Sequence, residues 1–229
     1  MQRAGSTSQE LQSCRAETLV SWTSALPGEA PIAELLIDQG RVGRAIELAR
    51  GAMAIGEEIR RPEHIAEAGA TLALAYVCMA AGADRLDAAQ TAIETACRHR
   101  RARRTLSAPV LAGIIALRRG DRWAAEDAFV EVEGEAGGLL AQDDRTFDAL
   151  DALGVAQCGR AVIGEDATEA LKRAVIAFEA ARALTVARGV VGRVVRLLNE
   201  LEEVAPPGLM NVPRQVAAGQ GVTGQSGRA

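Results

Sequence analysis

The sequence predicts an all-α protein built as an array of stacked helix pairs. Aromatic residues make up 3% of the chain and hydrophobic residues 48%, so the core must consist mainly of Ala, Leu, Val and Ile, and Ala and Leu are strong helix formers. Apolar residues also recur at helical steps of three and four. Finally, one pattern of a glycine followed by small or apolar residues occurs four times, as expected of a repeat architecture.

The amino-terminal part of the chain predicts a disordered segment followed by one helix. Residues 1–9 are polar, which favours disorder. Residues 10–25 carry Leu11, Leu19 and Trp22 at helical spacing, and a Pro-Gly pair then stops the helix. We expect this helix to flank the array.

The repeat is clearest at Gly120, which is followed by Asp121, Ala125, Phe129 and Val132. In this pattern the glycine ends one helix, the aspartate caps the next, and the other three residues form one buried stripe. The same steps of four and then three residues recur in three further copies, with one or two extra residues after Gly82 and Gly164. These copies are Gly40 with Ala45, Ala49 and Ala52, Gly82 with Ala89, Ile93 and Ala96, and Gly164 with Ala170, Ala174 and Ala177. The four glycines are 42, 38 and 44 residues apart, within the about 20 to 50 residues that indicate a solenoid.

These landmarks divide the array into four helix pairs. Pro31, Pro62 and Pro109 fall in the first turns of three successive first helices, where proline is tolerated. Asp166 with Glu169 resembles a capping box at the start of a second helix. The predicted repeats are residues 31–60, 62–103, 106–136 and 144–184.

The carboxy-terminal part predicts one more helix and then a tail. Residues 185–204 have valine and leucine on one face and arginine on the other, so we expect an amphipathic helix that closes the end of the array. Residues 205–229 are rich in Gly, Gln and Ser after a Pro-Pro-Gly stop, which favours a disordered tail. Residues 10–204 are therefore predicted to form one domain.

The repeat resembles the tetratricopeptide repeat, with the best match at Gly120, Ala125, Phe129 and Val132. The small residue that this family has in its first helix falls on Ala33, Ala75 and Gly113. The fourth unit departs from the pattern, because Gln157 or Cys158 falls at that place and no proline precedes its first helix. The resemblance implies a right-handed α-solenoid that binds proteins. Residues 180–201 are similar in composition to the closing segment of actinobacterial nucleotide-switch regulators.

The resemblance also implies a concave groove along the first helices. The Asn and Lys residues with which some family members clamp a carboxylate terminus are missing there. An apolar groove with an acidic end suits an amphipathic helix or a small apolar ligand, although Tyr76 and Met79 fit equally well in a core between neighbouring units. The predicted groove residues are Glu34, Asp38, Leu72, Tyr76, Met79, Val110, Ile114 and Leu117.

Residues 98–104 form the one local charge anomaly, a candidate basic patch. Its arginines could dock phosphates or an acidic partner, or they could complement the dipole at a helix end. No aromatic residue for base stacking is interleaved and the net charge is −4, which favours the structural interpretation. The arginines are Arg98, Arg100, Arg101, Arg103 and Arg104.

Composition and missing motifs exclude several classes of function. The acidic balance argues against nucleic-acid binding, no charge-free run is long enough to span a bilayer, and no secretory signal is present, so we expect a cytoplasmic protein. No phosphate loop or nucleophile elbow occurs and the chain has 2 histidines, which argues against an enzyme. The acidic clusters at residues 131–135 and 143–144 lack the spacing of a calcium loop, and we expect no metal and no cofactor.

The sequence thus predicts a non-catalytic scaffold that binds a protein or peptide, with its oligomeric state left open. The alternative is a ligand-sensing or regulatory segment of a larger transcription regulator or nucleotide-switch protein. A third hypothesis, an adaptor that contacts nucleic acid, depends on the arginines of residues 98–104.

Overall fold

The computed structural model describes residues 29–79, 82–100, 106–164 and 166–220. Within these ranges the chain forms ten helices and no strand, which confirms the all-α prediction. The helices are α2 (Glu29–Asp38), α3 (Val42–Glu58), α4 (Pro62–Cys78), α5 (Ala83–His99), α6 (Ser107–Arg118), α7 (Arg122–Leu140), α8 (Phe147–Ile163), α9 (Ala167–Leu184), α10 (Arg188–Glu202) and α11 (Asn211–Ala217). The predicted segments 1–9 and 10–25 lie outside the described residues.

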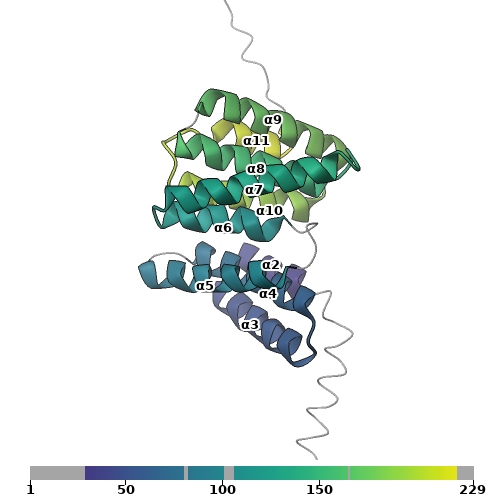
Figure 1. Ribbon diagram of the computed structural model, residues 1–229, viewed down its shortest axis with the longest axis vertical. Coiled ribbons are helices and arrows are strands. Elements are labelled where there is room, and N and C mark those ends of the chain that lie inside the picture. The colour runs from purple at the N-terminus through teal and green to yellow at the C-terminus, as the bar shows by residue number, and fades with distance from the viewer. Residues whose placement is uncertain (1–28, 80–81, 101–105, 165, 221–229) are drawn as a thin grey trace, which may run out of the picture.

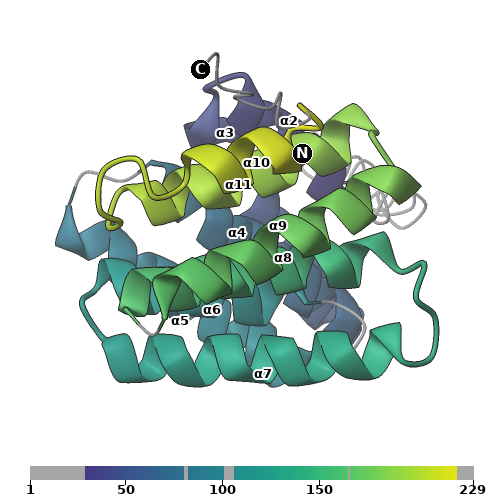
Figure 2. The same ribbon diagram turned by 90° about the horizontal axis from the view of Figure 1, so that it is seen from above.

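Helices adjacent in sequence pack side by side from α2 to α9, and alternate helices form a second set of contacts. In that set α2 contacts α4, α4 contacts α6, and α6 contacts α8. The pairs succeed one another along the longest axis of the molecule, from α3 in purple to α9 in green (Figure 1). Helices α10 and α11 lie on the side of α8 away from α7 (Figure 2). We call the face of α2, α4, α6 and α8 that is turned toward α10 the inner face.

The predicted repeat register is confirmed by burial. All twelve residues that follow the four glycines at the predicted spacing are buried, and each of those glycines has a positive φ. Gly120, with φ of 81°, ends α6 while the amide of Asp121 donates to the carbonyl of Ala116 at 2.9 Å. A left-handed residue at this position favours glycine.

Asp121 caps α7 as predicted, because its Oδ1 accepts a hydrogen bond from the amide of Ala124 at 3.0 Å. The predicted capping box at the start of α9 is wrong, since the side chain of Asp166 makes no capping hydrogen bond. Asp166 has a φ of 25°, which differs from the extended backbone typical of a capping residue.

Two phenylalanines fill gaps that glycines leave in the neighbouring helices. The ring of Phe129, on α7, is fully buried between Gly113 of α6 and Gly159 of α8. A Cβ atom at these glycines would lie 2.5 Å and 2.3 Å from the Phe129 ring. Phe178, on α9, contacts Gly154 of α8 in the same way, at 2.5 Å. The glycines therefore allow α7 and α9 to approach α6 and α8 closely.

The predicted disordered tail is corrected for residues 205–220. This segment continues into α11, which packs against α9 and α10. Met210 and Ala217 are fully buried there, so apolar burial orders a segment whose composition alone favours disorder. Helix α11 therefore covers the α9 end of the array, the place predicted for residues 185–204. Residues 221–229 lie outside the described residues.

No helix within the described ranges combines the length and the apolar character that crossing a bilayer requires.

Candidate functional site

Helix α10 covers the inner face instead of closing the end of the array. It packs against α6 and α8 through one buried stripe at helical spacing. The stripe consists of Val194, Leu197, Leu198 and Leu201. The amphipathic helix was predicted correctly from its pattern, but its position was not, because the pattern does not identify the surface that the apolar stripe contacts.

Charged side chains at the two edges of this stripe join α10 to the first helices of the pairs. Arg193 contacts Glu34 of α2 at 3.2 Å, and Arg196 lies 3.4 Å from the same carboxylate and also pairs with Asp38. At the other end, Glu200 pairs with Arg118 of α6. The arginines of α10 therefore neutralise the acidic residues that were predicted at the end of the groove.

The structure corrects the predicted open groove. Four of its residues, Leu72, Val110, Ile114 and Leu117, are buried in the core, and Tyr76 and Met79 are half-buried against it. Tyr76 accepts a hydrogen bond from Arg50, and Glu34 and Asp38 pair with α10 as described above. The predicted residues do lie along the inner face, but α10 and the helix contacts cover most of them.

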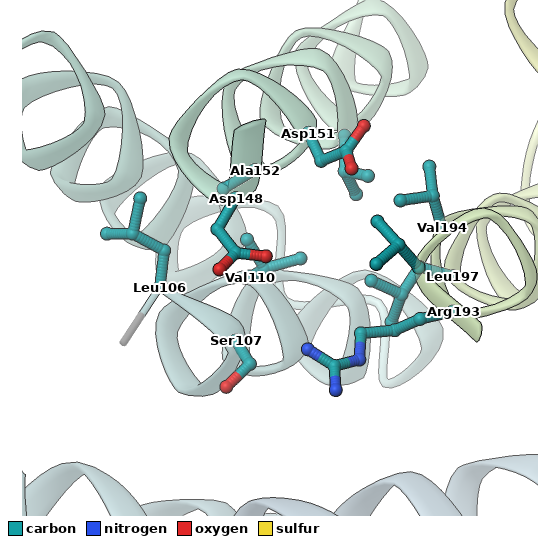
Figure 3. Close-up of a pocket in the computed structure, with 11 residues that line it drawn as sticks. Leu106, Ser107, Val110, Asp148, Asp151, Ala152, Arg193, Val194 and Leu197 are labelled. Atoms are coloured by element: carbon teal, nitrogen blue, oxygen red, sulfur yellow. The ribbon is translucent and has the colours of Figure 1, made fainter. Parts of the chain in front are cut away.

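A pocket lies on the inner face, between the start of α6, the first half of α8 and helix α10 (Figure 3). Its volume is about 170 Å³. The apolar wall includes Leu106, Val110, Val155, Val190, Val194 and Leu197. The polar groups are Ser107, Asp148, Asp151 and Arg193. Such a mixture of an apolar wall and a few polar groups is typical of small-molecule sites.

Asp151 is the most strongly perturbed group in this pocket. Arg182 of α9 donates from Nη2 to both carboxylate oxygens of Asp151, each at 2.5 Å, and both side chains are buried. Burial nevertheless raises the pKa of Asp151 to about 6, and Asp148 contributes to the rise while Arg182 and Arg193 oppose it. Desolvation of the carboxylate therefore outweighs its pairing.

In the natural protein, Asp151 should make the free energy of unfolding fall as the pH rises from about 4 to about 6, and Asp151→Asn should remove this fall. The carboxyl of Asp151 has a pKa of about 3.9 in the unfolded chain and of about 6 in the folded protein. The folded state therefore binds the proton of this carboxyl more tightly. The contribution of Asp151 is thus largest below about pH 4 and falls as the pH rises to about 6, by about 3 kcal/mol at most. Denaturant unfolding across this range measures it. The Asn variant should gain stability relative to the natural protein as the pH rises, whereas the exposed control Asp144→Asn should not.

One arginine of the run, Arg100, forms ion pairs within the fold. Arg100 follows α5, and its side chain pairs with Glu131 at 2.7 Å and Glu135 at 2.5 Å on α7. Glu133, the third member of that acidic cluster, pairs with Arg160 at 3.1 Å. Arg98 is exposed. Arg100 thus joins the end of α5 to the acidic cluster on α7, in the next helix pair. Arg101, Arg103 and Arg104 lie outside the described residues.

The pocket residues Ser107, Asp148, Asp151 and Arg193 were missed from the sequence, because they come from three helices and share no local motif. A second missed feature is Trp123, on α7. Its indole is 80% exposed, although tryptophan is normally well buried. The exposure of Trp123 could have been predicted from the repeat register, because Trp123 lies two residues before the buried Ala125 and therefore off the buried stripe.

The cysteine thiols within the described ranges have low reactivity. Burial raises the pKa of Cys78 to about 12 and also raises the pKa of Cys97 and of the fully buried Cys158. A thiol with a raised pKa carries little of the reactive thiolate at neutral pH. In the part of the chain that the structure describes, no three His, Cys, Asp or Glu side chains gather as a metal ion would require.

Comparison of the chain with family models, with curated proteins and with solved structures gives no match.

Proposed function

We propose that the protein is a non-catalytic scaffold of right-handed, tetratricopeptide-like helix pairs that binds a protein partner through its outer surface. Three features support the arrangement: alternate helices contact one another, the pairs turn at glycines with positive φ, and the Phe129 ring lies between Gly113 and Gly159. An experimentally determined structure in which successive pairs turn with the opposite hand would contradict it.

Because α10 covers the predicted groove, we propose that the partner binds a different surface. Three residues, 185–187, join α10 to α9. At its other end the chain continues into α11, where Arg182 donates to the carbonyl of Ala217 at 3.2 Å and Met210 is fully buried. Since α10 is held at both ends, a partner helix would have to unfold this whole region to reach the inner face.

The observation that carries the proposal is the exposed apolar surface of α7. Trp123 is 80% exposed and Val130, two helical turns further on, is 49% exposed. Both residues point well away from the fully buried Phe129, since they lie about 100° to 120° from it around the helix. Helix α7 runs along one edge of the molecule, on the side away from α10 (Figure 2). Tryptophan is enriched among the few residues that carry most of the binding energy of an interface.

Trp123→Ala is expected to abolish capture of the partner while leaving the fold intact. Loss of a central tryptophan weakens an interface by about 2 kcal/mol or more, which is about thirtyfold in affinity. We would immobilise the full chain, capture proteins from the native host, identify them by mass spectrometry, and compare the natural protein with the variant. Ile176→Ala is the matched control, because Ile176 is also an exposed apolar residue, on α9.

Two outcomes would contradict this proposal. If the natural protein and the Trp123→Ala variant retain the same proteins equally well, the partner does not use α7. If no specific protein is retained even by the natural chain, the scaffold function itself is wrong. Nucleic acid is left out of the proposal because Arg100, at the end of α5, is neutralised by Glu131 and Glu135.

The inner-face pocket favours a second candidate function, that of a ligand-sensing segment. The Ser107 hydroxyl has no hydrogen bond to a general base among the described residues, so we do not propose catalysis there. A pocket of about 170 Å³ has the size of a small-molecule site rather than of a peptide groove.

A further inference from the structure

The pocket under α10 carries one carboxylate that no neighbour neutralises. Asp151 is paired with Arg182, and Arg193 is paired with Glu34. The exposed carboxylate of Asp148 has no ion pair or hydrogen bond with any described residue, and it is directed from α8 toward Val110 on α6 (Figure 3). The pocket therefore has one negative charge in excess.

The remaining wall is apolar and compact. Val110 and Val155 belong to α6 and α8, and Val194 and Leu197 form the wall on α10. A cavity of about 150 Å³ lined by such side chains accommodates a molecule of the size of benzene, and this pocket measures about 170 Å³. The apolar part of a ligand can thus have about the size of one small ring or a branched chain.

We propose that this pocket binds a small organic cation, a protonated amine on a compact aliphatic or aromatic body. The ammonium group would donate to the carboxylate of Asp148, with the Ser107 hydroxyl within the same pocket as a second acceptor, because an ammonium group has three donors. The body would contact Val110, Val155 and Val194. An anion would meet the carboxylates of Asp148 and Asp151, and a neutral analogue would leave Asp148 without a charged partner.

A ligand in this pocket would contact α10 directly and would therefore favour the position in which α10 packs on the inner face. One wall of the pocket consists of Val190, Arg193, Val194 and Leu197, all on α10, while α6 and α8 form the opposite walls. A bound cation therefore stabilises the contact between α10 and the inner face by mass action. This inference does not depend on the partner surface at Trp123, so either proposal can fail without the other.

The test uses the full chain with benzylammonium as the probe, and with benzyl alcohol and benzoate as the neutral and anionic analogues. We expect saturable binding of benzylammonium in isothermal titration calorimetry, at millimolar concentration or below, and affinity at least about tenfold weaker for benzyl alcohol. Benzoate should not bind. Benzylammonium should also slow hydrogen exchange of the α10 amides.

Asp148→Asn should weaken benzylammonium binding by about tenfold or more. Because Asp148 is exposed, the variant should keep the melting midpoint of the natural protein. Asp144→Asn is the matched control, since Asp144 is an exposed aspartate nearby in the chain that does not line the pocket, and it should bind benzylammonium normally. Val190→Phe, which fills the pocket from its half-buried edge, should abolish binding of both benzylammonium and benzyl alcohol.

Three results would overturn the inference. The first is equal affinity for benzylammonium and benzyl alcohol, and the second is unchanged affinity in Asp148→Asn. The third is the lack of saturable binding of benzylammonium to the natural protein at millimolar concentration. If Val190→Phe fails to fold, Asp148→Asn still decides the outcome.

Discussion

Phe129→Ala is expected to lower the free energy of unfolding by about 3 to 5 kcal/mol, a large part of the about 5 to 15 kcal/mol of a typical domain. Phe129 is fully buried, and Gly113 and Gly159 approach both sides of its ring. The glycine backbones cannot move in to fill the cavity, because α6 and α8 are held by many other contacts. Thermal or denaturant unfolding measures the loss.

Trp123→Ala provides a control on the same helix. It removes a larger aromatic side chain from the exposed side of α7, so its effect on stability should stay within about 0.5 kcal/mol. Equal destabilisation by Trp123→Ala and Phe129→Ala would show that the two rings are not placed as described.

The contact between Phe129 and Gly159 can be measured separately. A Cβ atom at residue 159 would lie 2.3 Å from the ring, so Gly159→Ala should cost about 1 to 3 kcal/mol by overpacking. In a Phe129→Leu background the ring is gone and this cost should shrink. A double-mutant cycle with no coupling between the two positions would contradict the close packing of α7 against α8.

Arg182→Ala is expected to destabilise the protein by about 3 to 5 kcal/mol at neutral pH, because it leaves the buried carboxylate of Asp151 without its partner. The substitution also removes the hydrogen bond to the carbonyl of Ala217 that holds α11. The loss should decrease toward acid pH, where Asp151 takes up a proton and no longer needs a cation. Denaturant unfolding at two pH values measures both effects.

Arg173→Ala is the matched control on α9. Arg173 is exposed and lies 3.8 Å from Glu169, one turn away, and such exposed pairs contribute little, so the change should stay within about 0.5 kcal/mol. Replacing both members of the buried pair, as Asp151→Leu with Arg182→Met, should be much less destabilising than Arg182→Ala. A double variant as unstable as Arg182→Ala would show that the unpaired charge is not the cause.

Much of the fold could be predicted because its signals are local. The glycine at each turn, the cap at Asp121 and the stripe from Ala125 to Val132 depend on backbone conformation and helical period within about twenty residues. The structure bears out each of them. The capping box predicted at Asp166 failed because the backbone of that residue has a positive φ, which the residue types do not reveal.

Much less of the site could be predicted. The apolar stripe of α10 predicts that one face of this helix is buried. It does not predict what that face packs against, because the hydrophobic effect is not directional. Both the inner face and the end of the array could have received it. The structure places α10 on the inner face, and the predicted groove between Glu34 and Leu117 is therefore covered. Residues 205–220 were wrongly predicted to be disordered. Their apolar residues are few, but those at positions such as Met210 are buried against the array.

The sequence by itself determined that the repeat segments are helical, where most of them turn and which side of each second helix faces the core, because residues within one or two turns decide these properties. The tertiary structure decided which charges meet and which surfaces stay open. Arg182 lies 31 residues from Asp151 in the chain, and Arg196 lies 158 from Asp38. Pairings at such separation depend on how complete helices pack, and so do the pocket beside Asp148 and the exposed face of Trp123.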